Sequence, residues 1–287
     1  MFSFVSRWSL LLVGWLCSCG GSAALLELEC STQPIAPKHD SVACGGTGRL
    51  FDQLIPDFSA RPYSWPFNAQ LRRKADRQHR CAVTLLSERW ALTAAHCLDG
   101  LDKHAYEVVT GINVLHQPSI YTQVRAIKQF VAPIEWNIVT RPVCLPTDEL
   151  RVNGTCVTVG WGKATDAQGV AELQQAALPA IRLEACRLKW RGQEPNVTLP
   201  VNSLCTMENC RGSCHGDSGS GLFCKNGDGT KHTLYGVVSF ANKYPCTDRL
   251  PSVYVDVRHY VDWVNCAVEG TCADESARSN STTAQLA

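Results

Sequence analysis

The sequence predicts an all-β domain, either a barrel or a sandwich, followed by a helix near its C-terminal end. Short β-branched or alternating runs recur between turn-forming residues from about residue 54 to residue 268, among them "CAVTLL", "TCVTVGW", "LYGVVSF" and "SVYVDV". Strands this short and this frequent are typical of barrels and sandwiches. They give way to "VRHYVDWVNCAV", where Val257, Tyr260, Val261 and Val264 recur at helical spacing.

Length and charge set broad limits on function. The chain has 287 residues, of which 45% are hydrophobic, so it can build one large domain or two small ones. A formal net charge of +1 gives no reason to expect a nucleic acid or a strongly anionic partner. The basic run of residues 71–80 is interrupted by other residue types. We interpret it as a solvated loop in preference to a binding surface for an acidic partner.

The chain contains 16 cysteines, spread along its length. They do not form the C-x-x-C clusters with histidine that hold zinc, so the pattern favours disulfides, and we expect neither a metal nor a cofactor. Disulfides form in oxidising compartments. Acceptor sequons for N-glycosylation lie at Asn153, Asn196 and Asn280 and agree with an extracellular glycoprotein.

The N-terminal stretch has the order expected of a secretory leader. Arg7 precedes an apolar run, and small residues follow, so we predict a signal peptide over residues 1–24. The alternative is a signal anchor, but the apolar run is short and interrupted, so a secreted protein without a membrane partner is favoured. Residues 25–49 are polar and predict a pro-segment or linker, and residues 269–287 a polar tail.

A candidate nucleophile lies in "SCHGDSGSGL". Serine oxygen needs a base, donors for the developing oxyanion and a turn that exposes it. The N–H groups of Gly216 and Ser218 can point to one spot, because Gly216 has no Cβ to block the approach. Asp217 can orient the loop by pairing with a cation. The candidate base is His96 in "WALTAAHC", which a strand-like segment delivers and Cys97 can anchor.

These motifs occur in a familiar order. "SWPFNAQL", "WALTAAHC", "RPVCLP", "VTVGWG", "SCHGDSGSGL" and "SVYVDVRHYVDWV" together resemble the trypsin/chymotrypsin family of serine endopeptidases. The resemblance implies a protease domain over residues 50–268, built from two packed six-stranded antiparallel β-barrels with the site between them. It implies protein or peptide substrates, His96 as general base, Ser218 as nucleophile, and Gly216 and Ser218 as oxyanion donors.

The same resemblance implies a set of disulfides. These are Cys81–Cys97, Cys156–Cys224, Cys186–Cys205, Cys214–Cys246 and, as a tether of the pro-segment, Cys44–Cys144. Once the leader is removed, the sequence leaves the pairing of four cysteines open, namely Cys30, Cys210, Cys266 and Cys272.

One element of the family pattern is missing. The family carries a catalytic aspartate on a strand between the histidine and "PVCLP", whereas this chain reads "AIKQFVAPIEWNIVTRPVCLP". Both flanks keep family character, so the strand is expected to be absent at a junction near Val131 and Ala132, which leaves the first barrel incomplete. Six nearby acids are not expected to replace the aspartate: Asp99, Asp102, Glu107, Glu135, Asp148 and Glu149.

This loss decides how the activity is interpreted. In the family, neutralising the aspartate lowers kcat about 10⁴-fold, which is about 5 kcal/mol of barrier. Three readings follow: a truncated splice or gene-model form of an active protease, a non-catalytic protease homologue that binds partners, or an acid supplied from elsewhere in the chain. The abrupt join between intact flanks favours the first.

Activation and specificity also depart from the family pattern. The segment from Leu54 to Ala60 aligns with the family's "IVGG" start but lacks the glycine pair. An activating protease is expected to cut after Arg49, which leaves an amino terminus too early to insert cleanly beside Asp217.

The resemblance also assigns the substrate-binding positions. Gly212 aligns with the base of the specificity pocket and Ala241 and Ser252 with its walls; no carboxylate aligns there, although Asp248 is near in sequence. An uncharged, small or medium residue is therefore expected in the pocket. The strand that pairs with substrate comprises Ser239, Phe240 and Ala241.

Overall fold

The computed structural model describes most of the predicted protease domain. The described residues are 59–127, 133–147, 154–162, 171–207, 212–225, 232–240, 250–269 and 271, together with the backbone of a strand at 10–14. Within these ranges no helix has both the length and the apolar character needed to span a membrane.

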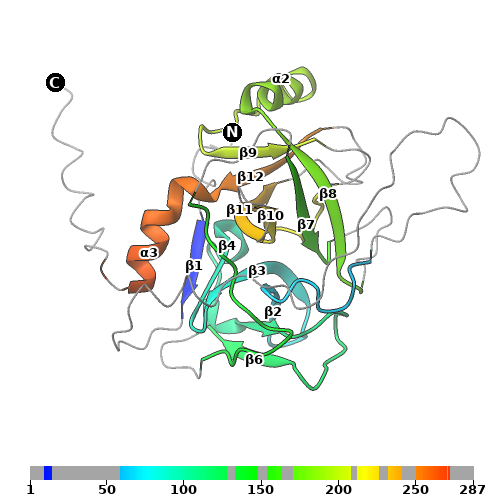
Figure 1. Cartoon of the computed structure of the whole chain (residues 1–287), viewed down its shortest axis with the longest axis vertical. Coiled ribbons are helices and arrows are strands. Elements are labelled where there is room, and N and C mark those ends of the chain that lie inside the picture. Colours follow the sequence, from blue (N-terminus) through cyan, green and yellow to red (C-terminus); the bar gives the residue numbers. More distant parts are fainter. Residues whose placement is uncertain are drawn as a thin grey trace, which may run out of the picture.

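The C-terminal half forms a closed antiparallel barrel of six strands in the order β10-β11-β12-β9-β8-β7 (Figure 1). Its strands are rich in β-branched and aromatic residues that favour extended backbone. They are β7 (Thr155–Gly160), β8 (Gln174–Ile181), β9 (Ser203–Thr206), β10 (Gly221–Lys225), β11 (His232–Phe240) and β12 (Ser252–Asp256).

The N-terminal half forms a six-stranded antiparallel sheet that does not close into a barrel within the described residues. Its order is β1-β4-β3-β2-β5-β6, so β1 and β6 are its two edges. The strands are β1 (Leu10–Gly14), β2 (Asn68–Arg73), β3 (His79–Ser87), β4 (Trp90–Ala94), β5 (Tyr106–Thr110) and β6 (Gln123–Ala126). The predicted all-β fold with an incomplete first barrel is confirmed. One strand comes from an unexpected source, because β1 lies within the predicted leader.

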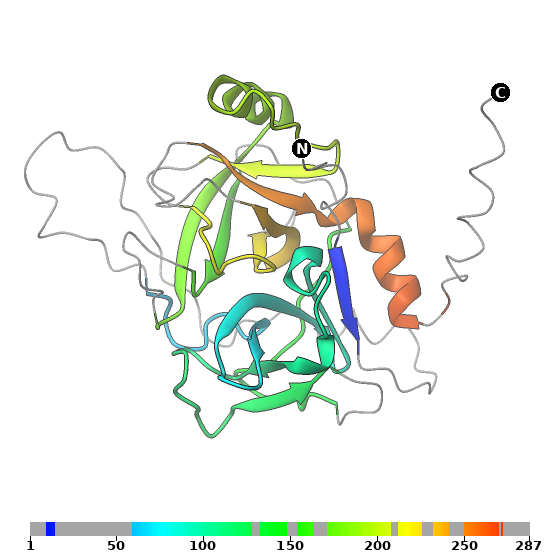
Figure 2. The same ribbon diagram turned by 180° about the vertical axis from the view of Figure 1, so that it is seen from behind.

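The two described α-helices lie at the periphery (Figure 2). The predicted C-terminal helix is confirmed as α3 (Val261–Glu269), which continues the 3-10 turn η3 (Val257–Tyr260). The side chain of Asp256 caps that turn by accepting a hydrogen bond from the N–H of Arg258. The other helical elements are α2 (Leu183–Gln193), η1 (Ala95–Cys97) and η2 (Lys103–Ala105).

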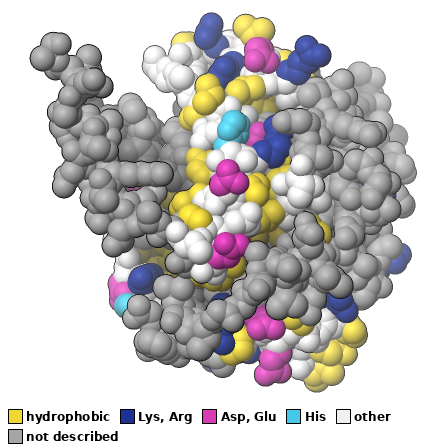
Figure 3. All heavy atoms as spheres, turned by 60° about the vertical axis from the view of Figure 1, so that its left-hand side comes forward, with side chains coloured by type: hydrophobic (Ala, Val, Ile, Leu, Met, Phe, Trp, Pro, Cys, Tyr) yellow, Lys and Arg dark blue, Asp and Glu magenta, His cyan; other side chains and the backbone are white. Residues whose placement is uncertain are grey.

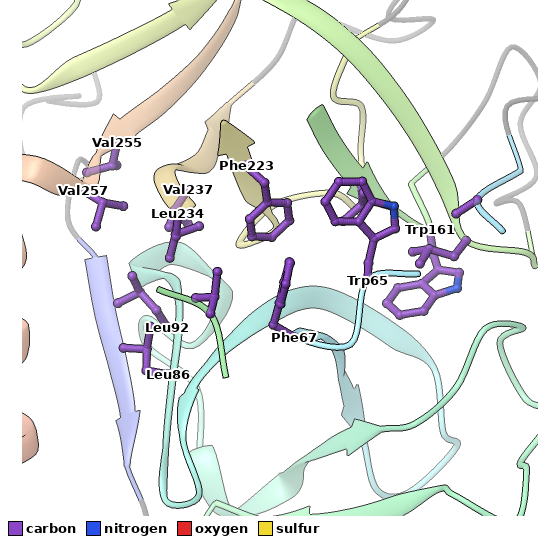
Figure 4. Packing of buried hydrophobic residues seen from close by; sticks show 14 of the residues in the cluster. Trp65, Phe67, Leu86, Leu92, Trp161, Phe223, Leu234, Val237, Val255 and Val257 are labelled. Carbon is purple, nitrogen blue, oxygen red and sulfur yellow. The ribbon is translucent and has the colours of Figure 1, made fainter. Parts of the chain in front are cut away.

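An aromatic cluster joins the two halves (Figure 4). Trp65 and Phe67 immediately precede β2, whereas Phe223 comes from β10. The rings of Trp65 and Phe223 stack with centroids 5.4 Å apart, and Phe67 and Phe223 are 4.7 Å apart. Aromatic pairs of this kind contribute about 0.5–1.5 kcal/mol beyond their buried area. The cluster therefore fixes the closed barrel against the open sheet.

Three of the expected disulfides are present within the described residues: Cys81–Cys97, Cys156–Cys224 and Cys186–Cys205. Cys144, Cys214 and Cys266 are also disulfide-bonded. Their partners are not among the described residues. The structure also does not describe five other cysteines, namely Cys44, Cys246, Cys30, Cys210 and Cys272. The pairings Cys44–Cys144 and Cys214–Cys246 therefore stay predictions, and the bonded state of Cys266 was not predicted.

Charges are mixed over the surface. In the basic hairpin of residues 71–80, Arg72 Nε lies 2.7 Å from Oε1 of Glu107, and Arg73 pairs with Asp76. On the face seen in Figure 3, the coloured basic and acidic side chains are interspersed with apolar ones. Both observations agree with the near-neutral net charge. The run that we interpreted as a loop is in fact the end of β2 and the start of β3, and only residues 74–78 form the turn between them.

Candidate active site

Ser218 lies on a tight turn that packs against the first sheet. Its carbonyl oxygen accepts a 2.9 Å hydrogen bond from the N–H of Ala82 on β3. A Cβ placed on the next residue, Gly219, would lie 2.2 Å from Oγ1 of Thr93 and 2.3 Å from the carbonyl oxygen of Ala82. Only glycine allows this approach, so the second glycine of "GDSG" lets the turn reach the end of β4.

His96 lies at that same end. It follows β4 in the turn η1, is partly exposed, and is flanked by Cys97, whose disulfide reaches back to Cys81 on β3. The Sγ of Cys97 is 3.8 Å from the carbonyl oxygen of Ser218. The fold thus brings the segments carrying His96 and Ser218 together across the boundary between the two halves, although they are far apart in sequence.

One arrangement of possible metal ligands coincides with this region. A ring nitrogen of His96 and the sulfurs of Cys81 and Cys97 all lie within 4.8 Å of one another. Both sulfurs belong to a disulfide, and a disulfide offers no thiolate to a metal ion. The group therefore acts as a covalent anchor beside His96 in this state.

The sequence analysis missed His79, which supports the predicted oxyanion site. Its Nε2–H donates a 2.9 Å hydrogen bond to the carbonyl oxygen of Gly216, which fixes the tautomer. Its Nδ1 is buried and makes no hydrogen bond within the described part of the chain. Burial lowers the pKa of His79, against a smaller raising effect of the bond to Gly216. The sequence feature that could have revealed this role is a histidine two residues before Cys81, but it lies in a run that we interpreted as a loop.

The carboxylate of Asp217 occupies a cradle made by two glycines. A Cβ on Gly160 would lie 1.9 Å from its Oδ1, and a Cβ on Gly162 would lie 2.3 Å from its Oδ2. Oδ1 accepts a hydrogen bond from the N–H of Gly162, and Oδ2 accepts one from the N–H of Cys214. The glycines of "VGWG" thus leave space for this side chain.

The same cradle removes water from the carboxylate. Burial raises the pKa of Asp217 to about 6, and the two backbone hydrogen bonds only partly oppose that rise. Residue Asp217 as a whole keeps some exposure, but the carboxyl group is enclosed. No cation among the described residues pairs with it, and the hydrogen bonds that its carboxylate accepts there come from the two backbone N–H groups.

The predicted activation segment is only partly placed. Within the segment from Leu54 to Ala60 only the last two residues are described, and Ser59 forms an isolated bridge to Gln174. The N–H of Ala60 donates a 2.7 Å hydrogen bond to Leu173. Arg49 and residues 50–58 lie outside the described residues.

The predicted specificity region is held by hydroxyl groups. Gly212 is partly exposed, and the N–H of the next residue, Ser213, donates a 3.0 Å hydrogen bond to Oγ of Ser252, a fully buried side chain on β12. The Ser213 hydroxyl donates in turn to the hydroxyl of Tyr254, at 3.3 Å. Sequence reasoning missed Ser213 and Tyr254. Their hydrogen bonds tie the segment after Gly212 to β12 through neutral groups.

The predicted substrate-pairing strand is the end of β11. Ser239 and Phe240 complete that strand, whereas Ala241 lies outside the described residues. The ring of Phe240 packs edge-on against Trp190 of α2, with centroids 5.0 Å apart. Trp190 Nε1–H donates to the carbonyl oxygen of Pro251, so α2 is fixed to both flanks of this region.

The acids near the predicted gap have other roles where they are described. Glu107 pairs with Arg72, and Asp102 accepts a hydrogen bond from the N–H of His104. Asp99 and Glu135 are exposed. The junction at Val131 and Ala132, the acids Asp148 and Glu149, and Asp248 all lie outside the described residues.

Of the predicted glycosylation sites, Asn196 is described. It lies exposed after α2. Asn153 and Asn280 are outside the described residues.

Comparison with known proteins agrees with this architecture. The family model described as Trypsin matches residues 55–264. The atrial natriuretic peptide-converting enzyme of Homo sapiens is 28% identical over 284 residues, covering 89% of this chain and 25% of that protein. The Mus musculus protein of the same name is 28% identical over 270 residues, covering 85% of this chain and 23% of that protein. The chain thus spans about a quarter of the length of these relatives. With its closed barrel, second sheet and family match, the chain belongs to the trypsin family of serine proteases.

Proposed function

We propose that the chain is an extracellular endopeptidase in which Ser218 is the nucleophile and His96 the general base, with activity reduced by loss of the family's aspartate. The observation that carries this proposal is the contact of the turn at Ser218 and Gly219 with the strand ends that lead to His96. Two side chains that must exchange a proton need their backbones held at this kind of junction.

The chemical step follows from these roles. Oγ of Ser218 attacks the substrate carbonyl carbon while His96 takes its proton, and the N–H groups of Gly216 and Ser218 stabilise the oxyanion. The peptide C–N bond then breaks, and the proton on His96 passes to the departing amine. In the second step water attacks the acyl carbon while His96 takes a proton from it, the bond from that carbon to Oγ of Ser218 breaks, and His96 passes the proton to Oγ.

The reduced activity is inferred from the sequence between β6 and Cys144. That interval contains Glu135 but no aspartate. Without a buried carboxylate behind the imidazole, its tautomer and its protonated form are less stabilised, and a loss of about 10⁴-fold in kcat is expected. The missing aspartate also favours a second candidate function, that of a secreted homologue that binds partners through the same region without catalysis.

Specificity, activation and export complete the proposal. The region at Ser213 and Ser252, which hydrogen bonds between neutral groups hold together, favours small or medium uncharged residues at the scissile position of a peptide, because a buried cation would need a carboxylate. An activating protease cutting after Arg49 is proposed as a partner. Export rests on the predicted leader and on the disulfides.

A fluorophosphonate probe tests the catalytic part. The oxidised full chain, before and after cleavage at Arg49, is expected to be labelled at Ser218. Replacement His96→Ala should slow labelling by about 10²–10⁴-fold. His259→Ala, which removes an exposed histidine on η3, is the matched control and should leave the rate unchanged. A folded sample that shows no labelling under either condition supports the non-catalytic homologue instead.

A further inference from the structure

We propose that the free edge of strand β4 is a strand-binding site, and that residues 10–14 of the same chain occupy it until the leader is removed. In the structure β1 pairs antiparallel with β4 over the whole length of both strands. The register runs without a shift from Leu10 opposite Ala94 to Gly14 opposite Trp90. A segment predicted to serve only in export is thereby the sixth strand of the first sheet.

Among the described residues, β1 is the strand that neighbours β4 on this side, and no other described strand is placed there. The other partner of β4 is β3, and β6, at the opposite edge of the sheet, pairs only with β5. The described residues 133–147, which follow β6, contain isolated bridges but no strand. Without β1, the outward N–H and C=O groups of β4 would form an open edge, and such edges capture additional strands.

The occupant is defined by its chemistry. Residues 10–14 read "LLLVG", five residues without charge or proline. Proline would remove a ladder hydrogen bond, and a charged residue on an edge strand disfavours pairing. The segment also belongs to the same chain, so pairing requires no second molecule. A second copy of the protein, or a foreign peptide, would be the alternative occupants.

The position of this edge gives the pairing a consequence for the site. β4 ends at Ala94, two residues before His96. The same strand end contacts the turn at Gly219. In Figures 1 and 2, β1 lies between the sheet and α3, and Figure 4 shows it running past Leu86 and Leu92. Pairing with β1 therefore restrains the strand that positions His96, and leader removal releases that restraint.

The two uses of residues 10–14 exclude each other. A segment inserted in a bilayer must satisfy its own backbone groups as a helix, whereas the strand satisfies them across the ladder to β4. The pairing therefore forms only in a chain that has left the export machinery with its leader attached. This inference concerns strand pairing and stands whether or not Ser218 is reactive.

Hydrogen exchange on the oxidised full chain tests the pairing directly. We expect amides in residues 10–14 and 91–94 to exchange at least about tenfold more slowly than in an unstructured chain. Leu12→Pro should remove that protection from residues 10–14 and from those amides of residues 91–94 that face β1, because the amides that face β3 keep their partners. Leu12→Val should retain the protection. Ser22→Pro, which lies outside β1, is the matched proline control.

The second barrel reports whether each variant is folded. If Leu12→Pro also loses protection in β10 and β11, the variant is unfolded, and the proposal is then judged only by the protection of residues 10–14 in the wild-type chain. Exchange of residues 10–14 at the unstructured rate in the wild-type chain, or unchanged protection of β4 in a folded Leu12→Pro variant, overturns the proposal. Protection that grows with protein concentration would assign the edge to a second copy and likewise overturn it.

Modification by diethyl pyrocarbonate tests the link to His96. We expect Leu12→Pro to raise the rate at His96 several-fold relative to the exposed His259 in the same sample, and Leu12→Val to leave the ratio unchanged. An unchanged ratio in a folded Leu12→Pro variant would show that β1 does not position His96.

Discussion

The N–H of Gly162 donates a 2.8 Å hydrogen bond to Oδ1 of Asp217, and a Cβ on Gly162 would lie 2.3 Å from Oδ2 of the same carboxylate. The residue before the candidate nucleophile and the second glycine of "VGWG" are therefore one structural unit. The unit joins the turn at Ser218 to the end of β7, so its integrity governs the geometry of the site.

Replacing Gly162 by alanine should destabilise the protein. The new Cβ would overlap a buried carboxylate that cannot move without breaking its hydrogen bonds, and overpacking of this kind costs about 1–3 kcal/mol. The free energy of unfolding from urea titration measures it. Gly192→Ala is the control, since no atom lies within 4 Å of a Cβ there and alanine favours helix α2 by up to about 1 kcal/mol. Equal destabilisation by both replacements would contradict the cradle.

The raised pKa of Asp217 predicts a particular pH dependence. Its pKa is about 6 in the folded protein and 3.8 ordinarily, so between these values the folded state binds more protons than the unfolded state. Stability should therefore fall as pH rises from about 4 to 6, by up to about 3 kcal/mol for this group.

Comparison with Asp217→Asn isolates that contribution. The difference in unfolding free energy between wild type and variant should change in favour of the variant as pH rises through this window. Parallel pH profiles for the two proteins would mean that the carboxylate is solvated or has a cationic partner.

His79 should show the opposite dependence. Burial lowers its pKa below 6.5, so the folded state resists protonation and stability is lost as pH falls below the ordinary value. His79→Phe should cost about 1 kcal/mol at pH 7 through the lost bond to Gly216. The difference in unfolding free energy between wild type and His79→Phe should become smaller on acidification, as measured by urea titration at pH 7 and pH 5. A difference that widens would show that His79 is protonated in the fold.

Ser252 should limit the residue accepted in the specificity region. Peptidyl phosphonates with alanine or phenylalanine next to the phosphorus provide the measurement. Ser252→Gly, which removes the side chain that accepts from Ser213, should raise the phenylalanine-to-alanine labelling ratio by about tenfold. Ser252→Ala keeps the Cβ and should give an intermediate ratio. If the labelling ratio is unchanged in both variants, the substrate side chain does not bind next to Ser252.

Much of the fold could be predicted from the sequence, and the sequence also singled out His96 and Ser218 as the proposed catalytic pair. Period-two runs and turn residues indicate short strands, and "ALTAAHC" and "GDSG" stand out because strand, anchor and turn chemistry are local properties. The disulfides Cys81–Cys97, Cys156–Cys224 and Cys186–Cys205 followed from a resemblance carried by ordered motifs.

Only the tertiary structure decided which groups distant in sequence meet. The bond from His79 to Gly216, the cradle of Asp217 and the bond from Ser213 to Ser252 each join segments that no local pattern relates. Pairing of β1 with β4 depends on an edge left open by the rest of the sheet. A sequence encodes the preference of a segment for extended backbone, but its neighbour is selected by long-range hydrogen bonding and packing.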